Sequence, residues 1–167
     1  MAAGGPIYGN SRLMKARIYV DASVVGGCED AEFARSSKAL MACFAKGDFV
    51  FVISPLTLQE LATAPDPVRK HLASVPEEHI ETVQLTAEAA DLAEAYITAG
   101  VITARTRADA QHIAMATVAR VDVLISWNFR HIVNLYRIRG YNSVNLRRGY
   151  PTLEIRAPRE VLPDEAG

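Results

Sequence analysis

Short apolar runs alternate with segments of helical periodicity along almost the whole chain. Runs rich in β-forming residues lie at 17–20, 49–53, 80–85, 121–126 and 152–156. Between them, apolar side chains recur at helical spacing in segments at about 29–45, 55–64, 67–74, 86–99, 106–120 and 130–139. This alternation predicts a parallel α/β sheet with helices on both faces. The Gly- and Asn-rich stretch 140–149 is predicted to be a loop.

The length of 167 residues fits one domain, which can bury a core without a disulfide or metal staple. We expect a folded domain at 14–162, a disordered tail or expression remnant at 1–13, and a short tail at 163–167. Cys28 and Cys43 form no CxxC motif, which favours a reducing, cytoplasmic compartment. No apolar run reaches the length of about 18 residues that a membrane-spanning helix needs.

The net charge of −1 conceals an uneven distribution of charge along the chain. Between Arg105 and Arg159, ten arginines stand against three acidic residues. This segment either forms a local basic surface that suits nucleic acid or spreads its arginines over a solvated surface. The sequence leaves both interpretations open.

Polar residues follow three of the predicted strands. Asp21 follows the first strand directly, Glu60 lies in the helix after the second, and Ser126 and Asn128 stand at the end of the strand near 121–126. Asp109 lies in the first turn of the helix that precedes that strand. Because ligands bind beyond the carboxyl ends of the strands in such sheets, we expect these side chains to meet at one edge.

Clustered carboxylates indicate a divalent cation. Two bare carboxylates within about 4–6 Å disfavour each other's charged state, and a cation reverses that cost. Mg²⁺ and Mn²⁺ take hard oxygen ligands and keep several waters. A cation held in this way suits phosphodiester hydrolysis, because it lowers the pKa of an attacking water and neutralises charge on the phosphate. The sequence does not decide between one and two ions.

Four stretches of the chain resemble the ordered motifs of PIN-domain proteins: Ile18–Val24, Ser54–Leu61, Asp109–Ala116 and Leu124–Ile132. They are most similar to the toxin ribonucleases of Vap-type toxin–antitoxin pairs and their close relatives, over about 14–162. The resemblance implies a PIN-like three-layer α/β/α fold with a central, mainly parallel sheet of about five strands. It also implies RNA substrates, a homodimer and, for the toxin branch, a small antitoxin that inserts near the site.

The resemblance further implies an acidic site with four positions. Asp21, Glu60 and Asp109 match the first three and would hold Mg²⁺, with Mn²⁺ as the alternative ion. The fourth position, often Asp in the family, is Asn128 here, whose amide can ligate a cation or orient water but brings no charge. Each residue also has a structural interpretation, as a turn residue (Asp21, Asn128) or a helix-capping residue (Glu60, Asp109).

Further residues are expected to orient the acids or to contact substrate: Ser23, Ser126, Arg130, His131, Arg147 and Arg148. The serines would hydrogen-bond to Asp21 or to a water, and the basic side chains would contact phosphate or an antitoxin. The alternative interpretations are that the serines are turn residues and that the basic side chains are only solvated. We interpret His112 as a packing or surface residue, Trp127 as a packing residue and Asp122 as structural.

Three functions compete for this pattern. The favoured one is a Mg²⁺-dependent endoribonuclease, acting as the toxin of a type II toxin–antitoxin pair in the cytoplasm. The alternative is a catalytically weak PIN-fold module that binds RNA or a partner, as the missing fourth charge suggests. A phosphatase with Asp21 as nucleophile is least favoured, because Ser23 stands where a second Asp is expected and no clear lysine motif follows.

Overall fold

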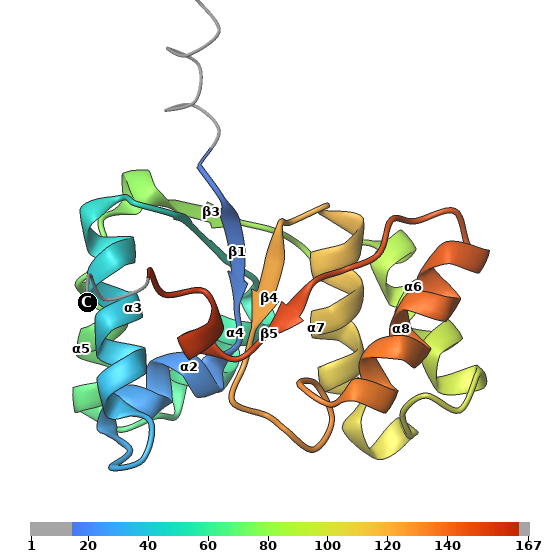
Figure 1. Cartoon of the computed structure of the whole chain (residues 1–167), viewed down its shortest axis with the longest axis horizontal. Helices are drawn as coiled ribbons and strands as arrows, with labels where there is room; N and C mark the ends of the chain where they lie inside the picture. The colour runs from blue at the N-terminus through green and yellow to red at the C-terminus, as the bar shows by residue number, and fades with distance from the viewer. Residues whose placement is uncertain (1–14, 164–167) are drawn as a thin grey trace, which may run out of the picture.

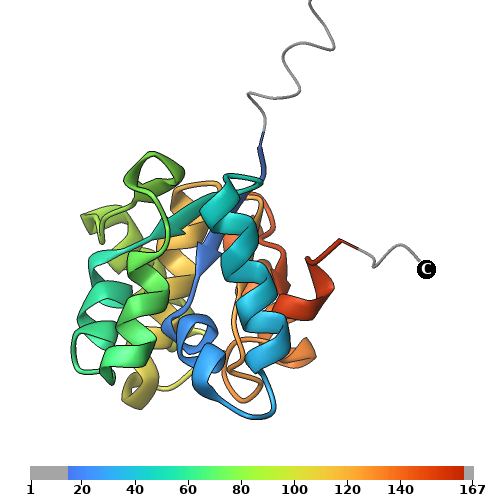
Figure 2. The same ribbon diagram turned by 90° about the vertical axis from the view of Figure 1, so that its left-hand side faces the viewer.

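The computed structural model describes residues 15–163 as three layers, with helices on both sides of a central sheet (Figures 1 and 2). The tails that we predict at 1–13 and 163–167 lie outside the described residues, apart from residue 163. No helix within 15–163 is long and apolar enough to cross a membrane. The layered α/β class expected from the alternating pattern is confirmed.

The sheet has five strands, and every neighbouring pair is parallel. The strand order is β3-β2-β1-β4-β5. The bounds are β1 (Arg17–Val20), β2 (Val50–Ile53), β3 (Ile80–Thr82), β4 (Val123–Ile125) and β5 (Ile155–Arg156). Because the strands are parallel, all of their carboxyl ends lie at the same edge of the sheet.

Different helices cover the two faces of the sheet (Figure 1). One face carries α6 (Ala87–Thr98), α7 (Arg107–Val118) and α8 (Leu135–Arg147). The other face carries α2 (Ala22–Gly26), α3 (Ala34–Lys46), α4 (Pro55–Ala62) and α5 (Asp66–Ala73). Short 3₁₀ turns lie at Gly27–Glu29, Glu77–His79, Ala104–Thr106 and Pro158–Glu160.

Successive residues of a strand pack alternately into two separate hydrophobic cores. Tyr19 of β1 packs with the α6–α7–α8 layer, whereas its neighbours Ile18 and Val20 pack with the layer of α2 to α5. This alternation follows from the two-residue period of a strand. Both faces of the central strand are therefore covered, which explains why β1 is apolar at consecutive positions.

Local sequence signals set the helix starts that matter for the site. Ser54 Oγ accepts the backbone N–H of Thr57 at 3.2 Å, and Pro55 is the first residue of α4. Glu60 therefore lies inside α4 rather than in a capping box that begins at Thr57. Its carboxylate remains available to other partners.

The segment 130–149 differs from our prediction. Residues 130–134 are not helical, and α8 continues through the stretch predicted as a loop. Gly140 lies against Val101, where an added Cβ would come within 2.7 Å of a methyl carbon. Asn142 Oδ1 accepts the backbone N–H of Leu153 at 2.7 Å. The Gly and Asn residues are thus packing contacts inside a helix, which their loop-like composition conceals. The short helix α2, directly after β1, was also not predicted.

Candidate metal centre

The residues that the sequence singled out lie at the carboxyl edge of the sheet. The chain builds the sheet from β1 towards β3 on one side and then adds β4 and β5 on the other. Such a switch in strand order is where open α/β sheets bind ligands. Asp21 follows β1, Glu60 comes from α4, Asp109 from the first turn of α7, and Ser126 and Asn128 follow β4.

Two serine hydroxyls hold the buried carboxylate of Asp21. Ser23 Oγ and Ser126 Oγ donate to Asp21 Oδ2 at 2.6 and 2.7 Å. Each hydroxyl also accepts a backbone N–H, from Trp127 at Ser23 and from Asn128 at Ser126. Because both serines donate to Oδ2, the other oxygen, Oδ1, keeps its lone pairs for a cation. The serines lie where an orienting role requires them.

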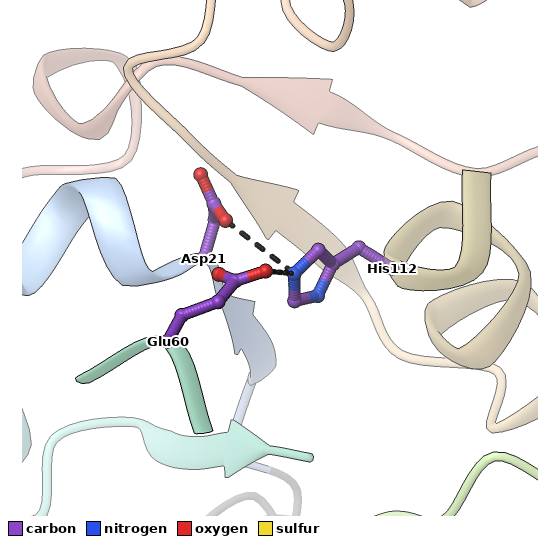
Figure 3. A group of neighbouring side chains, drawn as sticks. All are labelled: Asp21, Glu60 and His112. Atoms are coloured by element: carbon purple, nitrogen blue, oxygen red, sulfur yellow. Dashed lines mark hydrogen bonds and ion pairs between the residues drawn. The ribbon is translucent and has the colours of Figure 1, made fainter. Parts of the chain in front are cut away.

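Asp21 and Glu60 converge on a histidine (Figure 3). His112 Nε2 lies 3.0 Å from Glu60 Oε1 and 3.8 Å from Asp21 Oδ1. One ligand atom from each of the three residues lies within 4.8 Å of the other two. The side chain of His112 is fully buried, whereas that of Glu60 is 34% exposed. Solvent therefore reaches this group from the side of Glu60.

The ring of His112 is fixed from its other nitrogen. Tyr19 Oη lies 2.6 Å from His112 Nδ1 and 2.8 Å from Ser54 Oγ. A neutral ring that donates from Nε2 to Glu60 accepts the Tyr19 hydroxyl at Nδ1, and a charged ring instead donates from Nδ1 to the Tyr19 oxygen. Burial raises the pKa of Tyr19, which keeps this hydroxyl protonated. Strand β1 therefore positions Asp21 directly and His112 through Tyr19.

The electrostatic balance at His112 favours its charged form. Burial by itself lowers the pKa of His112, but the hydrogen bond with Glu60 and the charges of Asp21, Glu60 and Asp109 outweigh it. The net effect raises the pKa above its ordinary value of 6.5. We did not assign His112 to the site from the sequence. The available signal was its spacing, because residues three apart share one face of a helix and Asp109 stands three positions earlier.

Asp109 lies beside the same group of acids. Burial and, after it, the charge of Asp21 raise the pKa of the Asp109 carboxyl. Asn128 Nδ2 donates to Asp109 Oδ2 at 3.4 Å, while Asn128 Oδ1 accepts the N–H groups of Arg130 and His131 at 3.2 and 2.9 Å. Asn128 therefore supports both Asp109 and the turn after β4, and its amide oxygen is already engaged.

His112 is the one basic side chain in the described part of the chain that pairs with carboxylates of this group. No lysine or arginine in the described part of the chain forms an ion pair with Asp21, Glu60 or Asp109. Like charges held close together and partly buried repel each other. A divalent cation with oxygen ligands would offset that repulsion, and the donor set fits such an ion.

The basic residues predicted for substrate contact separate into two groups. Arg130 and His131 line a cavity close to Asp109. Arg147 and Arg148 instead lie at the C-terminal end of α8. This helix has 13 residues and is about 20 Å long, so they lie far from its start near the site. Their position offers no support for a role at the carboxylates.

Two further interpretations agree with the structure. Trp127 is buried, its ring is stacked on Phe33 with centroids 4.2 Å apart, and its Nε1 donates to Ser37 Oγ at 2.8 Å. Asp122 stands before β4, at the opposite edge of the sheet, and accepts the backbone N–H of Arg17 at 2.7 Å. Both residues therefore have structural contacts.

The strand order and the two helical layers define a PIN-like three-layer α/β/α fold. The chain is similar to a chain of the crystal structure of VapBC2 from Rickettsia felis bound to a DNA fragment from their promoter, with a TM-score of 0.50 and 13% identity. The match covers 84% of this chain and 98% of the other. No family model and no curated protein matches the sequence. The likeness is therefore one of fold.

Proposed function

We propose that the chain is a Mg²⁺-dependent endoribonuclease that hydrolyses RNA phosphodiester bonds, and that it serves as the toxin of a type II toxin–antitoxin pair. The observation that carries the proposal is the convergence of Asp21 and Glu60 on one point at the carboxyl edge, with Asp109 beside them. The PIN-like fold places this edge at the switch point of the sheet.

Asp21, Glu60 and Asp109 would hold the cation. Mg²⁺ and Mn²⁺ prefer oxygen ligands, which these carboxylates supply. When bound, the cation would supply Lewis-acid stabilisation of the phosphate and a more acidic water. Two carboxylates of this site are buried or partly buried, so their charges are screened less than surface charges are.

The chain's own residues prepare the site. Ser23 and Ser126 orient Asp21 so that Oδ1 faces the centre, and Asn128 donates to Asp109. His112 holds Glu60 in place through Nε2. Partners of this kind orient metal ligands and raise their affinity.

A second candidate function is a PIN-fold module that binds RNA or a partner with little turnover. The observation that favours it is the engagement of Asn128, whose oxygen accepts two backbone N–H groups and whose position brings no negative charge. Such a module would bind without cleavage and would depend little on Mg²⁺.

RNA cleavage separates the two candidates. The full chain is incubated with a structured RNA in Mg²⁺ and in excess EDTA, alongside Asp21→Asn and a control variant, Asp91→Asn, altered at an exposed acid of α6. The nuclease proposal predicts cleavage by the wild type and the control in Mg²⁺ only, and a loss of about 100-fold or more in Asp21→Asn. Equal cleavage in every condition would indicate contamination and contradict the proposal.

The toxin role, the antitoxin partner and the homodimer rest on the family resemblance, and the cytoplasmic location rests on the two isolated cysteines. A short reading frame next to this gene, whose product binds the chain and inhibits cleavage, is the expected finding for a toxin. Light scattering of the purified chain tests the homodimer.

A further inference from the structure

A cavity with basic walls adjoins the carboxylates. It has a volume of about 460 Å³ and is lined by Thr103, Arg105, Thr106, Arg130, His131 and Arg137, which together we name the arginine pocket. The pocket is linked to the site through one of its lining residues, because His131 donates its backbone N–H to Asn128 Oδ1 and Asn128 donates to Asp109.

The charged side chains that line the arginine pocket are all basic. No acidic side chain lines it. By contrast, Arg107 is paired with Glu94 and Arg17 is paired with Glu81. The guanidinium groups of Arg105 and Arg130 form no ion pair with any described residue, and Arg137 donates only to the carbonyl oxygen of Val101. Gathered cations without a counter-charge favour an anionic ligand.

One further feature of the pocket favours an anion. The pocket lies at the N-terminal end of α7, a helix of 12 residues that begins directly after Thr106, and this end carries a partial positive charge.

We propose that the arginine pocket binds a phosphate group of the substrate strand, next to the phosphate that is hydrolysed at the carboxylates. The proposal rests on the proposed nuclease function and deepens it by naming a subsite for a single-stranded nucleic acid. Guanidinium forks and hydroxyl groups match the several oxygens of a phosphate. A strand that passes the carboxylates would reach the pocket next, because His131 of the pocket is hydrogen-bonded to Asn128, which donates to Asp109.

Salt-dependent binding tests the subsite without relying on cleavage. A fluorescent single-stranded RNA is titrated with the full chain in excess EDTA at several salt concentrations. Each lost phosphate contact reduces the slope of log K against log salt by about 0.7 for a single strand. We expect Arg105→Gln and Arg130→Gln each to weaken binding about three- to tenfold and to reduce the slope by about that amount.

Arg139→Gln is the matched control. Arg139 lies on α8 two residues after Arg137, is exposed, and does not line the pocket. Arg139→Gln removes the same charge as each pocket variant. The subsite proposal therefore predicts that the salt-dependence slope of this control stays close to that of the wild type. Thermal melts of all variants confirm that the fold is intact.

The outcomes separate this subsite from the nuclease proposal. Reduced slopes in the two pocket variants, with the control unchanged, support the subsite even if no variant cleaves RNA. Three results would overturn it: no RNA binding by the wild type at low salt, equal slopes in all four proteins, or pocket variants that lose affinity for an acidic peptide but not for RNA.

Discussion

His112 links the pKa values at the site to the stability of the fold. Its pKa in the folded protein lies above 6.5, because hydrogen bonding to Glu60 and nearby negative charges outweigh the cost of burial. A group whose pKa is raised on folding contributes stability that is fully present below its unfolded pKa and is lost as the pH rises through its folded pKa. The metal-free protein should therefore become less stable as the pH rises above 6.5.

Urea denaturation in EDTA at several pH values measures this effect. The slope of the unfolding free energy against pH is limited to about 1.4 kcal/mol per pH unit for one proton. His112→Gln, which keeps a hydrogen-bonding side chain but does not titrate, should lose this slope. A slope that persists unchanged in the variant would mean that another group is responsible.

Asn128 determines the charge of the fourth position. In Asn128→Asp, the new side chain can still accept the N–H groups of Arg130 and His131, but it replaces the donor to Asp109 with a negative oxygen. Repulsion should destabilise the metal-free protein at neutral pH, and the added charge should raise divalent-cation affinity about tenfold.

Calorimetric titration and thermal melts in EDTA measure both effects of Asn128→Asp. Asn128→Ala is the control, because it loses the turn contacts as well as the hydrogen bond to Asp109 and gains no charge. It should lose stability without gaining affinity. Unchanged cation affinity in Asn128→Asp would place the fourth position outside the site.

At the scale of elements, one of two adjacent glycines packs against the loop that follows β4. A Cβ on Gly27 would lie 2.5 Å from Ser37 Oγ and 2.7 Å from Trp127 Nε1, whereas a Cβ on Gly26 would meet nothing within 4 Å. Both residues have a φ of −59°, so their backbone conformations are equally open to alanine. The difference between them is therefore one of packing.

Gly27→Ala should destabilise the protein by about 1–3 kcal/mol, because it forces apart α3 and the loop that carries Ser126 and Asn128. Gly26→Ala should change stability by less than about 1 kcal/mol and in the stabilising direction. Urea denaturation of both variants measures the difference. Equal effects of the two substitutions would contradict the packing explanation.

The strands and most helices could be predicted because their signals are local. Ser54-Pro55 and Thr86 mark helix starts, and β2 and β4 are continuous apolar runs. The path of α8 could not be predicted, because Gly140 and Asn142 are explained only by their contacts with Val101 and Leu153, which lie outside the helix. His112 was missed for a related reason. Its partners Tyr19 and Glu60 come from other strands and helices.

At the scale of the molecule, the site joins the two helical layers across the sheet. Asp21 comes from the central strand, Glu60 from the layer of α2 to α5, and Asp109 and His112 from the layer of α6 to α8. A motif-based prediction could name the acids but not this arrangement, because it depends on the strand order β3-β2-β1-β4-β5. A cation bound here would bridge the two helical layers, which the hydrogen bond between His112 and Glu60 already links.

Calorimetric titration of the full chain with Mg²⁺ and Mn²⁺ tests that bridging directly. We predict saturable binding by the wild type and by Asp91→Asn, and an affinity at least about tenfold weaker in each of Asp21→Asn, Glu60→Gln and Asp109→Asn. Equal affinity for the cation in the wild type and in all three of these variants would contradict the account.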